Sequence, residues 1–286
     1  MVTFFYVVFL DAVPEIIYYA KMSIIQKSKK YSALIDIVKF GMLAGAIVWL
    51  LLRGSSRVGY NWQWYQVPRY LFTFEDGIFV PGPLLDGLWV TLEITACSLV
   101  LASVIGMLTA LLRLSGSRVG CFIARLYLEV IRNSPLLVQI FFLYFVLAPI
   151  FELERFTAAV IALSLFEGAY ASEIYRSGIV AVNKGQWEAS YTLGLSTYQS
   201  YCYIILPQAI RRILPPLTSQ AVSLIKDSSL VSVIAIYEMT MYANEIASET
   251  FLVFEIFFTI AAIYLALTIT LSRVVAYFEK RYRVVS

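Results

Sequence analysis

Long runs of apolar residues are the feature that most limits what this chain can fold into. The runs cover about residues 34–53, 87–112, 125–148, 157–178, 217–241 and 253–276. Each is long enough to cross a bilayer as an α-helix. Hydrophobic residues make up 60% of the 286 and charged residues 14%, a balance typical of polytopic membrane proteins. The sequence therefore predicts an all-α membrane helix bundle with about six transmembrane helices.

The first thirty residues stand apart from this predicted bundle. Residues 1–20 are apolar but include Asp11, Pro14 and Glu15, which fits either an interfacial helix or a poor seventh span. They lack the basic leading residues of a secretory signal. We expect a cytoplasmic or interfacial segment over residues 1–30 and one transmembrane domain over residues 31–286.

Lys and Arg are distributed unevenly between the two sets of predicted loops. The richer set is Lys21, Lys27, Lys29, Lys30, Arg113, Arg118, Arg125, Arg176, Lys184, Arg211, Arg212, Lys280, Arg281 and Arg283, and the poorer set is Arg53, Arg57, Arg69 and Arg155. Because cytoplasmic loops carry the excess of positive charge, residues 179–216 should face the cytosol. The chain is thus predicted to be a multi-pass membrane protein in contact with lipid.

The composition argues against several kinds of chemistry. The sequence contains no His, which removes the commonest general base and transition-metal ligand. Cys97, Cys121 and Cys202 have neither a metal-ligand spacing nor a disulfide pattern. No Gly-x-x-x-x-Gly-Lys-Ser/Thr phosphate loop is present, and the net charge of +3 reflects the membrane bias rather than a nucleic-acid partner. We expect no enzymatic activity, no metal and no cofactor bound by this chain.

Two regions of the predicted bundle have a distinctive composition. Residues 54–86 are rich in Tyr and Trp and end in the turn Pro81-Gly82-Pro83, which fits an interfacial aromatic belt or a docking surface for an extracytoplasmic partner. The fourth span carries many small residues, which favours a central position in the bundle or a subunit interface. These are Ala158, Ala159, Ala162, Ser164, Gly168, Ala169, Ala171 and Ser172. Pro135 and Pro215-Pro216 are expected where the third and fifth spans begin irregularly or bend.

Residues 186–209 lie between two spans and are predicted to form two short helices set at an angle. The first ends at Gly194, a residue that accepts the left-handed backbone often needed at a helix end. The second begins at Ser196, which with Gln199 has the spacing of a capping box. Pro207 is expected to end it. Such a capped elbow offers a compact shape for another protein to bind.

The sequence around this elbow resembles a known family. Glu188-Ala189-Ser190, Gly194 and Ile204-x-Leu206-Pro207 are similar to the Glu-Ala-Ala loop of permease subunits in bacterial ABC importers, with Ser190 in place of the usual alanine. Further similarities point to the polar amino-acid branch of these binding-protein-dependent inner-membrane components. They are Ser134-Pro135-Leu136-Leu137-Val138-Gln139, Ala169-Tyr170, Glu173-Ile174, Arg176-Ser177-Gly178-Ile179, Pro207-Gln208-Ala209 and Leu224-Ile225-Lys226-Asp227-Ser228-Ser229-Leu230.

This resemblance implies a fold, a mechanism and a set of partners. The fold would be that of a type I ABC importer permease in the bacterial cytoplasmic (inner) membrane, importing polar amino acids by alternating access. The coupling loop, at about residues 182–213, would contact a separate ATP-binding subunit, and the residues expected to carry this coupling are Glu188, Ala189, Ser190, Gly194, Leu195 and Pro207. The partners would be two ATP-binding subunits that use the ATP, a second permease chain, identical or related, and an extracytoplasmic substrate-binding protein.

Polar groups within the spans are candidates for the substrate pathway, because they are costly in lipid unless paired or facing water. These candidates are Glu167, Gln139, Ser228 and Ser229. Glu167 is equally compatible with a pairing role between helices. Glu129 and Arg132 lie toward the cytoplasmic end of the third span, where snorkelling or mutual pairing at i, i+3 explains them. For these two residues and for Lys226 and Asp227 we favour structural ion pairs.

A second function remains open on the residues alone. The charged groups in the third to fifth spans also fit an ion-coupled secondary transporter or a channel that needs no ATPase. Against it, the sequence shows no detectable inverted repeat and does contain the complete cytoplasmic motif.

Overall fold

The structure is a computed structural model that describes residues 35–47, 49–50, 53–54 and 59–282, with side chains as far as Tyr277. It divides into two compact units, Met1–Trp62 and Gln63–Ser286. In the first unit, residues 35–47 of the predicted span 34–53 are helical. The predicted segment 1–20 and the boundary at residue 30 lie outside the described residues.

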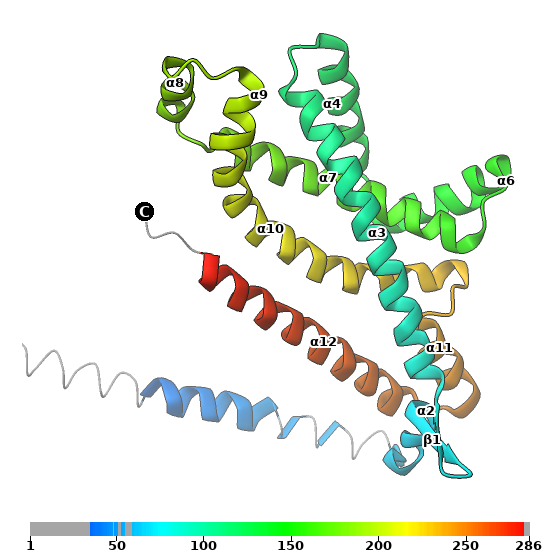
Figure 1. Cartoon of the computed structure of the whole chain (residues 1–286). Helices are drawn as coiled ribbons and strands as arrows, with labels where there is room; N and C mark the ends of the chain where they lie inside the picture. Colours follow the sequence, from blue (N-terminus) through cyan, green and yellow to red (C-terminus); the bar gives the residue numbers. More distant parts are fainter. Residues whose placement is uncertain (1–34, 48, 51–52, 55–58, 283–286) are drawn as a thin grey trace, which may run out of the picture. The chain divides into compact units, whose positions relative to one another are not determined.

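The second unit is built almost entirely of helices (Figure 1). Its α-helices are α2 (Pro68–Leu71), α3 (Pro83–Leu114), α4 (Arg118–Arg132), α5 (Leu136–Phe141), α6 (Ala148–Phe151), α7 (Arg155–Val180), α8 (Lys184–Thr192), α9 (Thr197–Ser200), α10 (Leu206–Asp227), α11 (Met239–Thr250) and α12 (Val253–Tyr282). The 3-10 helices are η1 (Trp64–Gln66) and η4 (Ser228–Ile234), and the π-helical segments are η2 (Phe142–Leu147) and η3 (Tyr201–Ile205). Strands β1 (Phe72–Glu75) and β2 (Ile78–Pro81) form an antiparallel hairpin within the aromatic segment 54–86, which the sequence analysis did not anticipate.

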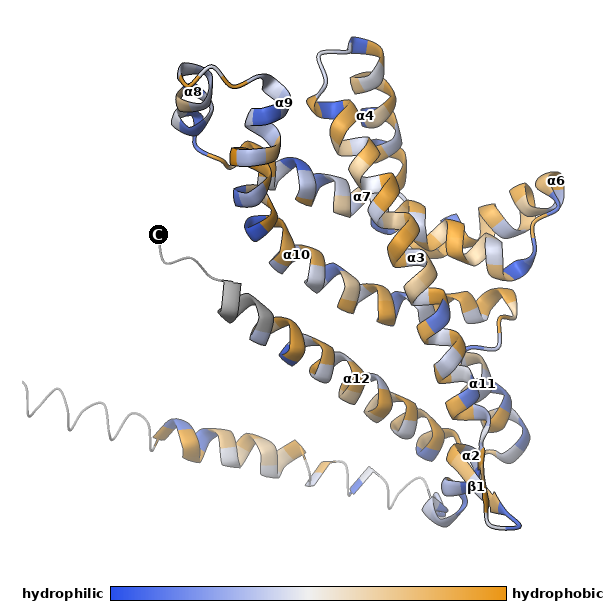
Figure 2. Ribbon diagram, in the orientation of Figure 1, coloured by the Kyte–Doolittle hydropathy of each residue, from blue (hydrophilic) through white to orange (hydrophobic). Residues whose placement is uncertain are grey.

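Three of the predicted spans are single long helices. α3, α7 and α12 are long and apolar enough to cross a membrane, and they correspond to the predicted runs 87–112, 157–178 and 253–276. Figure 2 shows α3 and α12 as mainly hydrophobic along their length. Two further spans are bent pairs of helices, so the described residues contain up to five spans by length and composition.

The predicted third span, 125–148, is not one helix. α4 ends at Arg132, and the helical segment that follows, Leu136–Phe151, is turned by 107° relative to it. Pro135 lies at the break, as expected, and adopts an extended conformation as the residue preceding α5. Proline has no N–H to donate to the preceding turn, so a break is favoured at this position.

The predicted fifth span, 217–241, lies within a longer, bent pair of helices. The helical path begins at Thr197 and runs to Ile234, where a 51° bend leads into α11. Pro207 does not end the second short helix. The Leu206 N–H donates to the Tyr201 carbonyl, which closes a π-helical turn, and Pro207 follows in the first turn of α10, where its missing N–H is tolerated. Pro215 and Pro216 lie inside α10 rather than at its start.

The most extensive packing in the second unit is between α3 and α7. A Cβ atom at Gly106 would lie 2.9 Å from the Ala171 Cβ and 3.0 Å from the Gly168 carbonyl oxygen, so the two backbones approach closely here. The small residues of α7, among them Ala159, Ala162 and Ala169, are buried. The predicted central position of this helix is therefore confirmed, and small side chains permit the approach.

Enlarging the residue at this crossing is expected to destabilise the bundle. Gly106→Ala introduces a methyl group into contact with Ala171 and should cost about 1–3 kcal/mol, as overpacking typically does. Gly116→Ala is the matched control, since nothing lies within 4 Å of a Cβ at that position. Thermal unfolding of the detergent-solubilised complex would measure both, and equal stability of the two variants would contradict the close approach.

Candidate functional site

The elbow predicted at residues 186–209 is present, and its helices are capped by their own side chains. Asn183 Oδ1 accepts the Gly185 N–H at 2.8 Å at the start of α8. Gly194 follows the helix with a φ of 75°, the left-handed conformation that glycine adopts without steric cost. Ser196 and Gln199 form the predicted capping box, with bonds of 3.3 and 2.9 Å. The two helices therefore begin and end where the local sequence specifies.

Contacts between α8 and the helix that follows hold the elbow together. The Ser190 side chain is buried, and its hydroxyl donates to the Trp187 carbonyl at 2.7 Å. The Trp187 ring lies edge-on to Tyr201, with ring centroids 4.8 Å apart. The Leu195 N–H donates to the Ser190 carbonyl at 3.1 Å across the turn. These contacts hold α8 against the turn at Leu195 and against Tyr201 in η3.

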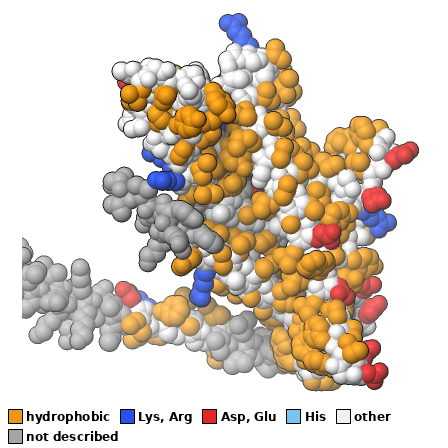
Figure 3. Space-filling view, viewed as in Figure 1, with side chains coloured by type: hydrophobic (Ala, Val, Ile, Leu, Met, Phe, Trp, Pro, Cys, Tyr) orange, Lys and Arg blue, Asp and Glu red, His pale blue; other side chains and the backbone are white. Residues whose placement is uncertain are grey.

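The outer face of the elbow offers both charge and apolar surface. Among the residues predicted to couple, Glu188, Ala189, Gly194 and Pro207 are exposed, Leu195 is half-buried and Ser190 is buried. Several large apolar side chains are also exposed, namely Tyr191, Leu193, Tyr198 and Tyr203. Figure 3 shows hydrophobic side chains among other surface atoms at the upper left, where α8 and α9 lie in Figure 1. A surface of this kind suits a protein partner.

Comparison with known proteins identifies the chain. The family of binding-protein-dependent transport system inner membrane components matches residues 102–284. The chain belongs to this family. It is therefore a membrane-spanning permease subunit of an ATP-driven importer, a multi-pass protein of the inner membrane, and not an enzyme itself. The ion-coupled transporter or channel is not favoured, because this family works with ATP-binding subunits and substrate-binding proteins.

Individual relatives agree with the family. The permease is 38% identical over 204 residues to the glutamine transport system permease protein GlnP of Escherichia coli (strain K12), covering 70% of this chain and 93% of the relative. It is 40% identical over 203 residues to the L-cystine transport system permease protein TcyB of Bacillus subtilis (strain 168), covering 70% of this chain and 86% of the relative.

Solved structures show the same type I importer fold. A crystal structure of an amino acid ABC transporter with histidines has a TM-score of 0.66 and 38% identity, covering 70% of the permease and 94% of that chain. An inward-facing MetNI methionine ABC transporter has a TM-score of 0.57 at 16% identity, covering 68% and 95%, and this shows the fold alone.

The four residues predicted for the substrate pathway lie on three elements of the permease. Glu167, on α7, is 3% exposed, and its Oε1 has no hydrogen-bond partner among the described residues. Gln139, on α5, donates from Nε2 to the Ile131 and Ser134 carbonyls at 2.8 and 3.0 Å, which spans the break between α4 and α5. Ser228 and Ser229 begin η4 and donate to backbone carbonyls three residues earlier. In the described part of the chain, no hydrogen bond joins any two of these four side chains.

Arg132 is in a structural ion pair, as predicted, but within the described residues its partner is not Glu129. The Arg132 Nη1 lies 3.7 Å from the Glu173 Oε1, whereas Glu129 accepts a hydrogen bond of 2.9 Å from the Asn133 amide. The cause is the crossing of α4 over α7, which brings Arg132 close to a carboxylate of another helix. Nor does an ion pair within the described residues join Lys226 and Asp227.

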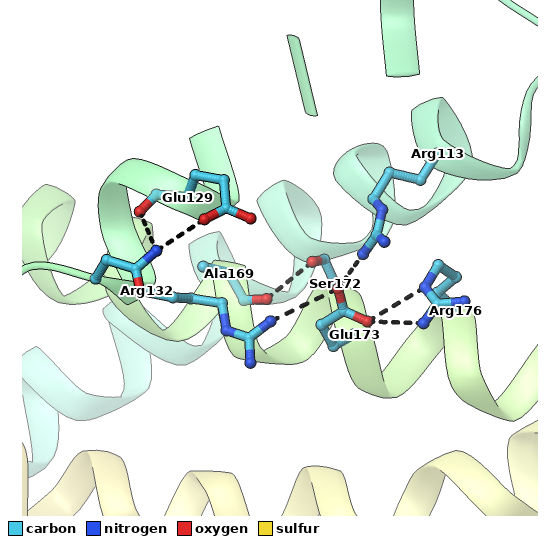
Figure 4. Close-up of polar contacts among 8 residues, drawn as sticks. Arg113, Glu129, Arg132, Ala169, Ser172, Glu173 and Arg176 are labelled. Carbon is cyan, nitrogen blue, oxygen red and sulfur yellow. Dashed lines mark hydrogen bonds and ion pairs between the residues drawn. The ribbon is translucent and has the colours of Figure 1, made fainter. Parts of the chain in front are cut away.

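Glu173 is the centre of a cluster that sequence reasoning missed. Arg113, from α3, and Arg176, one turn along α7, also pair with it, the latter at 3.0 Å (Figure 4). The i, i+3 spacing of Glu173 and Arg176 was a signal for one of these pairs. The pairs from α3 and α4 depend on helix crossings, for which the sequence gives no spacing rule. One carboxylate thus ties three helices together.

Removal of this central carboxylate is expected to destabilise the permease. Glu173→Gln leaves three guanidinium groups without their common partner, and because the site is partly exposed we expect a loss on the order of 1–2 kcal/mol. Glu129→Gln is the matched control, because Glu129 is in no ion pair among the described residues. Thermal unfolding of the purified complex should rank Glu173→Gln below Glu129→Gln, and the reverse order would contradict the central role of Glu173.

Proposed function

We propose that this permease imports a polar amino acid, and that the elbow at residues 186–207 receives the movement of the ATP-binding subunit. The observation that carries the proposal is the elbow itself. Its two helices are held together by internal contacts, and its outer face exposes charged and apolar side chains. The amino-acid class is supported by relatives named for glutamine and L-cystine transport at 38% and 40% identity.

The assembly that we propose has four subunits in the membrane and at its cytosolic face. Two permease chains, identical or related, enclose the pathway, and two ATP-binding subunits contact the two elbows. A single extracytoplasmic binding protein delivers the amino acid. The permease binds no cofactor of its own, and the ATP is consumed by the partner subunits. The mechanism is alternating access, in which approach of the ATP-binding subunits reopens the bundle on the other side.

The path for this movement runs from the elbow into the membrane. The helical path from Thr197 to Ile234 is continuous, so a displacement of α9 is carried along α10. Two side-chain contacts also join α10 to the chain where it enters the elbow. Arg212 donates to the carbonyl of Ala181, just before α8, and Gln208 donates to the side-chain oxygen of Gln186, the first residue of the elbow, at 3.3 Å. α10 in turn packs on α7, where a Cβ at Gly178 would overlap the Ile213 side chain. Both ends of the elbow are therefore attached to central helices.

Substitutions on the outer face of the elbow should uncouple transport. Gly194→Asp or Glu188→Lys is expected to leave membrane insertion intact but to lower substrate-stimulated ATP hydrolysis about tenfold or more, because each places a wrong charge against the partner. The measurement is ATP hydrolysis by the complete transporter in proteoliposomes with its binding protein and substrate.

Gly194→Asn separates charge from backbone conformation in this test. Asn tolerates the left-handed conformation and has the size of Asp without its charge, so coupling should be largely retained. Unchanged stimulation in both Gly194→Asp and Glu188→Lys would remove the coupling assignment.

Glu167 is the strongest candidate for a substrate contact within the spans. It is buried in α7, and one of its carboxylate oxygens has no partner among the described residues, a costly arrangement in a membrane unless it serves binding. We expect Glu167→Gln, which keeps the side-chain shape, to lower uptake several-fold while the ATP-binding subunits still co-purify. Uptake at the normal rate would assign Glu167 to packing instead.

A further inference from the structure

A polar cavity of about 310 Å³ lies between α3, α4 and α7. Its charged and aromatic lining consists of Arg113, Arg125, Glu129, Arg132, Tyr170 and Glu173. Arg113 is one residue from the end of α3, and α7 ends only four residues before α8 begins. The cavity therefore lies toward the cytosolic end of the bundle, on the same side as the elbow.

The charges in and around this cavity are not balanced. The two oxygens of Glu173 are shared by Arg113, Arg132 and Arg176. Arg125 has no ion pair or hydrogen bond within the part of the chain that the structure describes, and it is exposed. Four guanidinium groups thus face two carboxylates, Glu129 and Glu173. An excess of positive charge at a membrane surface attracts a counter-anion.

The arginines are suited to a tetrahedral oxyanion. Guanidinium groups bind phosphate through paired N–H donors, and basic pockets between helices on the cytoplasmic side of a membrane favour phosphorylated headgroups. Arg125 and Arg132 are seven residues apart and so lie on one face of α4. The neighbouring face of α4 exposes Phe122, Leu126 and Val130, at four-residue spacing. A polar cavity beside an apolar strip matches the headgroup and acyl chains of a phospholipid.

We propose that this cavity is a phosphate-binding site, in which Arg113, Arg125 and Arg132 hold the phosphate group of an anionic phospholipid or a free phosphate. Occupancy of the site is measured directly, without a transport assay. Arg125 is the residue to change first, because it takes no part in the Glu173 cluster and its loss leaves the helix contacts intact.

The experiment uses the complete transporter in two arms. In the first, complexes in nanodiscs of phosphatidylglycerol and phosphatidylcholine are analysed by native mass spectrometry for retained lipid. In the second, complexes in a phosphate-free maltoside detergent are titrated with inorganic phosphate and followed by phosphorus NMR. The variants are Arg125→Gln, Glu129→Gln and the matched control Arg273→Gln, which removes an exposed arginine on α12 away from the cavity.

We expect wild type to retain phosphatidylglycerol in preference to phosphatidylcholine, and Arg125→Gln to weaken this retention about tenfold. Glu129→Gln removes a repelling charge and should strengthen retention, while Arg273→Gln should match wild type. If only inorganic phosphate binds, with the same dependence on Arg125, the proposed phosphate site is supported and its ligand is the soluble anion rather than a lipid. The proposal is overturned if neither phosphate source binds, or if Arg125→Gln behaves as wild type in both arms.

Discussion

The close contact between α3 and α7 is the constraint on which the rest of this permease depends. Within a bilayer, apolar side chains gain little by meeting each other instead of lipid, so helices associate where their backbones can approach. Gly106 and Gly168 provide that approach: a Cβ at Gly168 would lie 2.9 Å from the Ile105 Cγ2, just as one at Gly106 would meet Ala171. With α3 fixed against one part of its surface, α7 presents Gly178 to α10 and Glu173 to the arginines of α3 and α4.

The coupling role that we propose for the elbow depends on this arrangement. Its own bonds make it a rigid unit, but a rigid loop moves nothing unless its ends are attached to the bundle. α7 leads into it directly, and the unbroken helical path from Thr197 leads out of it into the membrane. The π-helical turn at Tyr201–Ile205 is what keeps that exit continuous past Pro207. The elbow is therefore joined at both ends to the helices that form the central packing.

Sequence reasoning succeeded where the signal is local and failed where it depends on helix crossings. Hydropathy located α3, α7 and α12, and the capping residues Ser196 and Gln199 located the start of α9. Pro135 marked the break after α4, but no local rule gives its 107° angle. The prediction that Pro207 ends a helix was wrong, because it assumed a regular α-helix before the proline and did not foresee the π-helical turn that accommodates it. The partner of Arg132 could not be predicted, because Glu129 lies at the i, i+3 spacing, whereas the actual partner, Glu173, is brought near only by tertiary packing.

The basic residues of the cytosolic side illustrate how one feature serves two roles. Arg113 and Arg125 belong to the excess of Lys and Arg from which the orientation of the chain is predicted, and in the sequence they need no further explanation. Folding gathers them with Arg132 around one cavity, where topology alone does not require them to converge. A charge needed only for orientation is free to lie anywhere along a cytosolic loop. Convergence on a polar cavity is a stricter arrangement, and it is this that points to a bound anion rather than to orientation alone.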